Sequence, residues 1–253
     1  MNITAAARAN HDELFPDHQS KLAVSDPEFV ELFDNFAFDE LIAHSTLDTR
    51  LRMTVILAAL IAMQTVNEYR VMLGGALNVG VTPVQVKEIL YHAVPYVGQA
   101  RAFDFFHATN DVLTERGVAQ PLEGQSTTTR QTRHDAGLTL RATIFGGVAD
   151  TMYAKVPSTQ LRIQEHLSAN CFGDYWTRTG LDLATRELLT FSMLASMGGC
   201  ENQLRSHIQG NLNVGNDKAA LIDVLTQLLP WIGYPRTLNA LAAVNEVIPE
   251  PSH

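Results

Sequence analysis

Three residues in the segment 200–215 have side chains that could carry out chemistry: Cys200, Gln203 and His207. Their spacing of three and four residues places them along one face of an α-helix. A histidine titrates near neutral pH and can donate or accept a proton, whereas a cysteine is a nucleophile once its thiol is ionised. The segment therefore predicts a helix that presents an imidazole, a thiol and an amide together.

A second helix could supply the other wall of a pocket. The residues just upstream, 186–197, are mostly apolar and begin with the charged pair Arg186 and Glu187. Such a helix, followed at once by the one that carries the thiol and the imidazole, could enclose a partly desolvated pocket in which Glu187 relays a proton. The pattern leaves one alternative open: two core helices whose Cys and His are packed and inert, because such residues are common in cores.

The composition excludes several classes of partner. The chain has 253 residues, 18 basic and 27 acidic side chains and a net charge of −9, which argues against nucleic acid or an anionic membrane. Two cysteines give no disulfide framework. The first residues lack a signal-peptide pattern, and the longest apolar run, 53–63, is too short to span a bilayer. We expect a soluble, cytoplasmic protein, which can still bind a small anionic molecule if a few arginines line a local pocket.

The sequence contains an internal duplication with an offset of 135 residues. The segment 75–80 (GALNVG) aligns with 210–215 (GNLNVG), identical at five of six positions, and 95–98 (PYVG) aligns with 230–233 (PWIG). A repeat of this length indicates two copies of a domain. We therefore predict a repeat one at 25–117, a linker at 118–133 and a repeat two at 134–248.

Each repeat is predicted to be helical. The apolar runs 53–62 and 188–196 are typical of a central helix buried on most sides. Gly80 and Gly215 suit left-handed helix caps, and the segment 82–85 (TPVQ) suits a helix start whose helix continues to Pro95. A further helix is expected at 138–145. Strand signals are scarce, so the fold class predicted is all-α.

Repeat two resembles the carboxymuconolactone decarboxylase family. The resemblance rests on the segments 134–146 (HDAGLTLRATIFG), 170–189 (NCFGDYWTRTGLDLATRELL), 201–215 and 228–233 (LLPWIG), and repeat one matches more weakly. The superfamily includes the alkylhydroperoxidase D-like proteins, whose helical domains assemble as trimers or hexamers. The resemblance implies a tandem alkylhydroperoxidase D-like fold and a homotrimer of pseudo-hexameric appearance.

The chain departs from the peroxidase pattern of that superfamily. Gln203 stands where a second cysteine belongs, so no disulfide can close on that helix, although a one-Cys reaction or one resolved by Cys171 remains open. Repeat one has Thr65 in place of Cys200 and Met72 in place of His207, and we interpret it as mainly structural. His92 is the exception, because its HAVPYVG segment resembles a family motif; a catalytic role and a helix-face role near a subunit contact stay equally open.

The resemblance favours a lyase that decarboxylates a small carboxylated lactone. His207 would transfer the proton, Gln203 could donate a hydrogen bond, and Arg178 and Arg186 are candidates to grip a carboxylate or lactone oxygen. Either arginine could equally lie at the surface or between subunits, and Trp176 could wall the pocket or belong to the core. No set of residues has metal-ligand spacing and no phosphate-binding loop follows a strand, so cofactor-free chemistry is expected. The alternatives are a thiol-dependent peroxidase that uses Cys200 and a non-catalytic binding scaffold.

The two cysteines separate these alternatives. Cys200 follows Gly199 at the start of the helix, where the helix dipole favours the thiolate, so its pKa is expected to be lowered if it also faces His207. Cys171 lies among aromatic residues, and burial should keep it protonated and slow to react.

Overall fold

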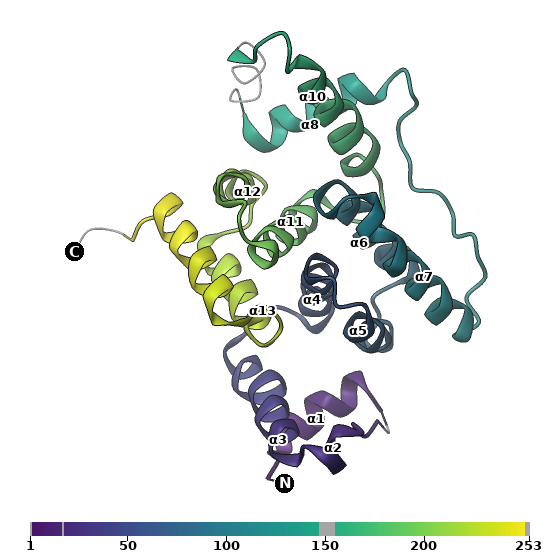
Figure 1. The fold of residues 1–253 in the computed structure, drawn as a ribbon, viewed down its shortest axis with the longest axis vertical. Coiled ribbons are helices and arrows are strands. Elements are labelled where there is room, and N and C mark those ends of the chain that lie inside the picture. Colours follow the sequence, from purple (N-terminus) through teal and green to yellow (C-terminus); the bar gives the residue numbers. More distant parts are fainter. Residues whose placement is uncertain (1, 17, 147–154, 251–253) are drawn as a thin grey trace.

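The computed structural model describes residues 2–16, 18–146 and 155–250 (Figure 1). Within these ranges the chain forms helices and loops and contains no strand, so the all-α prediction is confirmed. The elements in chain order are α1 (Ala5–Leu14), α2 (Leu22–Ser25), α3 (Pro27–Asn35), η1 (Phe36–Glu40), η2 (Ile42–His44), α4 (Thr49–Met63), α5 (Val66–Asn78), α6 (Pro83–Val97), α7 (Gln99–Glu115), α8 (Arg133–Phe145), α10 (Leu161–His166), η3 (Leu167–Trp176), α11 (Leu183–Met197), α12 (Glu201–Asn213) and α13 (Lys218–Val247).

The two repeats have the same order of helices, which confirms the tandem duplication. Helices α5 and α12 are the same segment shifted by 135 residues, and α4 and α11 correspond in the same way to within one residue. Helix α13 corresponds to α6 and α7 joined end to end. It breaks at Gly233, whose φ of 76° matches the φ of 84° at Gly98, where α6 ends.

Helices α4 and α11 pack against each other at the centre of the molecule (Figure 1). Every residue at 52–62 in α4 and at 186–196 in α11 is buried, as the continuous apolar runs predict. Helix α6 of repeat one also packs against α11, and α13 of repeat two packs against α4. Each repeat therefore covers the central helix of the other, and the two share one core.

The predicted helix ends are largely confirmed. Gly80 and Gly215 have φ values of 91° and 99°, and Thr82 caps α6 through a reciprocal pair of hydrogen bonds with Gln85. The predicted end of α6 at Pro95 is wrong, because the helix continues to Val97. A proline near the helix end removes only one N–H and leaves the last turn intact. Helix α8 likewise begins at residue 133 rather than 138.

Two π-helical segments, η1 and η3, precede the central helices at equivalent positions in the two repeats. Segment η3 packs closely on α8 through Gly137 and Gly173. A Cβ atom on Gly137 would lie 1.9 Å from the Ser168 carbonyl oxygen, and one on Gly173 would lie 2.0 Å from the Arg133 carbonyl oxygen. The close approach and the wider helical turn carry Trp176 inward, where it is buried. Segments of this kind are frequent at functional sites.

The residues between α7 and α8 form an extended segment that runs along the outer edge of the molecule (Figure 1). Thr127 and Thr128 attach it to η3 by donating hydrogen bonds to the carbonyl oxygens of Thr177 and Gly173. None of the helices in the described ranges is long and apolar enough to cross a membrane.

Candidate active site

His207 and Glu187 form a buried pair between α12 and α11. The His207 Nδ1 atom lies 3.0 Å and 3.2 Å from the two Glu187 carboxylate oxygens. Glu187 is fully buried and His207 is 7% exposed. Asn211, one turn after His207, donates to the His207 carbonyl oxygen at 2.7 Å and more weakly to Glu187 Oε2 at 3.4 Å. The pairing leaves Nε2 of His207 without a hydrogen-bond partner among the described residues.

The pair has the electrostatics of an acid–base couple. Burial raises the pKa of Glu187, and the nearby His207 opposes that rise. A carboxylate that accepts the Nδ1 proton fixes the ring tautomer and stabilises the imidazolium. Gly210 permits this approach, because a Cβ atom there would lie 3.0 Å from each Glu187 carboxylate oxygen.

Three aromatic rings surround the imidazole of His207. Trp176 from η3 stacks on it with a centroid distance of 5.9 Å and an interplanar angle of 19°. Phe145 from α8 meets it edge-on at 5.3 Å, and Tyr96 from α6 meets it at 6.1 Å. Trp176 is thus a buried member of the cluster, and its role as a wall of a substrate pocket stays a prediction. Tyr96 belongs to repeat one, so residues of both repeats build the cluster.

His92 lies in the same cluster and is the centre of a hydrogen-bond chain. Its Nε2 atom lies 3.0 Å from the Arg186 carbonyl oxygen and 2.9 Å from Thr190 Oγ1. Because a carbonyl only accepts, Nε2 must carry the proton. Burial and the Arg186 charge lower the His92 pKa well below its usual range, which keeps the ring neutral. His92 therefore positions its neighbours and does not titrate near neutral pH.

The chain ends on the Tyr96 hydroxyl. Thr190 Oγ1 donates to Tyr96 Oη at 3.1 Å, and Trp176 Nε1 donates to the same atom at 3.1 Å. An indole nitrogen can only donate, so the Tyr96 oxygen acts as an acceptor in this arrangement. No described residue accepts the Tyr96 proton. Burial raises the Tyr96 pKa well above its usual value, and the proton is therefore retained.

Arg178 and Arg186 are engaged by a buried carboxylate on α6. Glu88 accepts hydrogen bonds from Arg178 Nη2 at 2.8 Å and from Arg186 Nη2 at 3.1 Å. Arg186 Nη2 also donates to the carbonyl oxygens of Arg178 and Thr179. Glu88 and Arg186 are each 1% exposed. The structure therefore does not support the predicted grip on a substrate, because this ion-pair network instead joins α6 of repeat one to repeat two.

Gln203 and Cys200 lie outside the cluster. The buried face of α12 runs through Leu204, His207 and Asn211, and Gln203 beside it is exposed. Helix α12 begins at residue 201, so Cys200 precedes it and the predicted common helix face does not reach that residue. The Cys200 thiol donates to the Leu194 carbonyl oxygen and lines a shallow pocket between α11 and α13.

The thiols are held in their protonated form. Burial and the neighbouring Glu201 raise the Cys200 pKa. The lowering that was expected if Cys200 faced His207 does not occur, because the thiol lies outside the His207 cluster. Burial also raises the Cys171 pKa, to about 12, as predicted. No group of three His, Cys, Asp or Glu residues in the described ranges could hold a metal ion.

Several residues of the cluster were not singled out from the sequence: Tyr96, Thr190, Phe145, Asn211 and Glu88. Tyr96 and Glu88 lie on the same helix as His92, at i+4 and i−4, and this spacing was a usable signal. Asn211 lies at i+4 from His207 on α12 and had the same signal, whereas Thr190 and Phe145 gave none, because they reach His92 or His207 only through helix packing.

The comparisons agree with this architecture. A sequence profile of the Carboxymuconolactone decarboxylase family matches residues 27–111 and 162–246. The 4-carboxymuconolactone decarboxylase of Acinetobacter baylyi is 27% identical over 116 residues, which is 46% of this chain and 86% of that protein. A crystal structure from Burkholderia xenovorans LB400, provisionally named a gamma-carboxymuconolactone decarboxylase subunit, has 18% identity and a TM-score of 0.55, covering 93% of this chain and 94% of that one.

The structural neighbour extends the likeness in fold across both repeats, whereas the matched length of the Acinetobacter enzyme is about that of one repeat. The family profile covers most of the chain in two segments that fall on the two helical units of the structure. This chain belongs to the Carboxymuconolactone decarboxylase family.

Proposed function

We propose that the chain is a carboxy-lyase that acts on a small carboxylated lactone, with His207 as the proton carrier. The observation that supports this most is the buried pair of His207 and Glu187. The Nε2 atom of His207 has no hydrogen-bond partner among the described residues, and aromatic rings surround the imidazole. The relative from Acinetobacter is named for such a reaction, and the family membership makes the class of reaction the first choice.

The proposed reaction needs one proton. The bond between the ring carbon and the carboxylate breaks, CO₂ leaves, and the electron pair delocalises into the unsaturated lactone. His207, protonated at both nitrogens, then donates its Nε2 proton to carbon while Nδ1 stays bound to Glu187. The Glu187 carboxylate stabilises the imidazolium before transfer, and a proton from solvent restores the pair.

Tyr96 is the proposed contact for the lactone oxygen. Its hydroxyl accepts from Trp176 and Thr190 and has a proton left to donate, and its ring lies beside His207. A donor placed where negative charge develops lowers the barrier, because a buried site screens it weakly. Tyr96 and Phe145 are only partly buried, and a substrate would enter along them.

The test is CO₂ release from 4-carboxymuconolactone by the wild type and by His207→Gln. We expect His207→Gln to abolish turnover and to keep the helical circular dichroism spectrum. His107→Gln is the matched control, because His107 is exposed on α7. Equal turnover by His207→Gln and wild type would refute the proposed role, and a folded wild type without turnover of any lactone acid would favour a binding scaffold.

A further inference from the structure

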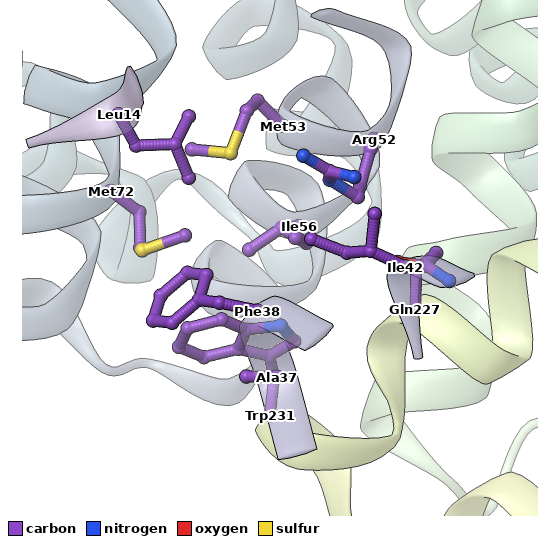
Figure 2. Close-up of a pocket in the computed structure, with 10 residues that line it drawn as sticks. All are labelled: Leu14, Ala37, Phe38, Ile42, Arg52, Met53, Ile56, Met72, Gln227 and Trp231. Atoms are coloured by element: carbon purple, nitrogen blue, oxygen red, sulfur yellow. The ribbon is translucent and has the colours of Figure 1, made fainter. Parts of the chain in front are cut away.

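Repeat one contains a pocket at the position that corresponds to the His207 cluster of repeat two (Figure 2). A shift of 135 residues relates Met72 to His207 and Arg52 to Glu187. The same shift relates Gln227 to His92 and Trp231 to Tyr96. The pocket is lined by Met72, Arg52, Gln227 and Trp231. Repeat one thus has a thioether and a cation at the positions where repeat two has the acid–base pair.

Arg52 is an unusual residue for such a place. It is 5% exposed, and its guanidinium makes no hydrogen bond or ion pair with any described residue. The other lining side chains are mostly apolar, among them Leu14, Phe38 and Ile56. Figure 2 shows the guanidinium directed into the space that these side chains surround. The guanidinium nitrogens keep some contact with solvent, since none of them is among the fully buried unpartnered atoms. A charge in so buried a side chain is still costly without a partner, and a bound anion would supply the opposite charge.

The neighbouring carboxylates do not neutralise Arg52. Asp223 accepts hydrogen bonds from Ser45 Oγ at 2.9 Å and from the Thr46 amide at 2.6 Å, and makes no ion pair with Arg52. Glu13 is exposed. Burial lowers the Arg52 pKa, and Glu13 and Asp223 only oppose that effect from a distance. The guanidinium therefore retains its capacity to bind an anion.

We propose that this pocket, which we call the Arg52 pocket, binds a small monocarboxylate with an apolar body. A guanidinium matches a carboxylate through two parallel hydrogen bonds, and this geometry favours a carboxylate over a spherical anion. The rings of Phe38 and Trp231 and the side chain of Ile56 form walls suited to an apolar group. A dianion would leave a second charge among these apolar side chains.

The size of the pocket limits the ligand. The free space at its centre is about 10 Å³, enough for one water molecule. Met53 and Met72 line it, and their unbranched side chains can rearrange to admit a larger group. A flat, small acid such as benzoate can therefore enter only if both methionine side chains move aside.

The Arg52 pocket is a binding site without proton transfer. Neither an arginine nor a methionine exchanges protons near neutral pH, so a carboxylate bound here is not decarboxylated. Gln227 and Trp231 come from α13 of repeat two, and an occupied pocket would therefore join the two repeats. Binding at the Arg52 pocket is independent of the proposed lyase activity, because no residue of the His207 cluster lines this pocket.

The chain has two tryptophans: Trp176 lies in the His207 cluster and Trp231 lines the Arg52 pocket. This allows a direct test. In Trp176→Phe, Trp231 is the only indole, and its fluorescence reports on the Arg52 pocket. We expect benzoate to change this fluorescence saturably and the neutral isostere benzamide not to change it. Adding Arg52→Met should raise the benzoate Kd by at least about tenfold, whereas Arg101→Met, at an exposed position, should not.

A second measurement avoids the change at Trp176. Benzoate should raise the Tm of the wild type and of His207→Gln, and should not raise the Tm of Arg52→Met. Without ligand, Arg52→Met should melt at or above the wild-type Tm, because it removes a buried unpaired charge. No saturable benzoate signal, equal affinity in Arg52→Met, or a lower Tm of ligand-free Arg52→Met would overturn the proposal. If Arg52→Met does not fold, Arg52→Lys, which keeps the charge and loses the fork, must weaken benzoate binding.

Discussion

Glu187→Gln isolates the charge of the buried acid from its shape. Glutamine is nearly isosteric and keeps an oxygen that can accept the His207 Nδ1 proton at about the same place. What is lost is the negative charge that stabilises the imidazolium. A hydrogen bond to a charged group contributes about 1.5–3 kcal/mol, so kcat should fall roughly 10- to 150-fold.

The same change should leave the fold intact. Burial raises the Glu187 pKa above that of an unfolded glutamate, so the ionised form is less favourable in the folded chain. Stability from this group is fully present below the unfolded pKa and is lost as the pH rises through the folded pKa. Removing the charge at neutral pH should therefore keep or raise the free energy of unfolding in urea. Glu115→Gln, at an exposed position on α7, is the matched control.

The pH dependence gives an independent check. Wild-type activity should fall on the acid side as Glu187 becomes protonated, at a pH above the usual range of a glutamate. This acid limb should be lost or displaced in Glu187→Gln. Unchanged kcat in Glu187→Gln, or an equal loss of kcat and stability, would show that Glu187 is a packing residue and refute the reasoning.

Three further predictions concern α12, the two thiols and the assembly. Gly210→Ala places a Cβ atom 3.0 Å from each Glu187 carboxylate oxygen, so steady-state kinetics should show a lower kcat while circular dichroism shows α12 intact; an unchanged kcat would mean that the carboxylate can shift freely. Cys200 and Cys171 should react slowly with a thiol reagent at pH 7, and Cys200→Ser should retain lyase activity; rapid labelling of Cys200 with loss of activity would favour a thiol mechanism. Light scattering should give a homotrimer, because Phe29, Phe103 and Leu238 are exposed apolar side chains that a monomer leaves uncovered, and a monomer mass at micromolar concentration would contradict this.

Much of the fold could be predicted because its signals are local. The apolar runs at 53–62 and 188–196 require helices buried on most sides, and the glycines and capping residues mark helix ends wherever they occur. The duplication is visible because two short motifs recur at one offset. The π-helical turn of η3 was not predictable, because its backbone hydrogen bonds differ from those of an α-helix by one residue and the side chains give no distinct period.

The candidate site was only half predictable. His207, Glu187 and Trp176 belong to one repeat and carry recognisable chemistry, so the sequence placed them in one region. A polar side chain is available to a ligand only if no other residue of the protein already forms its hydrogen bonds or ion pairs. Those partners can be distant in sequence, so the sequence alone does not reveal them. Arg178 and Arg186 were predicted to grip a substrate, but both pair with Glu88, which lies 90 and 98 residues earlier in the sequence.

The sequence by itself determined the helices, the duplication, the family resemblance and the residues able to transfer a proton, since each depends on residue type and short-range spacing. Only the tertiary structure showed that α6 of repeat one packs against α11 of repeat two, because this crossing depends on how the two complete repeats pack together. The crossing brings Tyr96 to His207 and His92 to Trp176, and its counterpart brings Trp231 and Gln227 to the pocket of Arg52. Each of the two places is therefore built from both repeats.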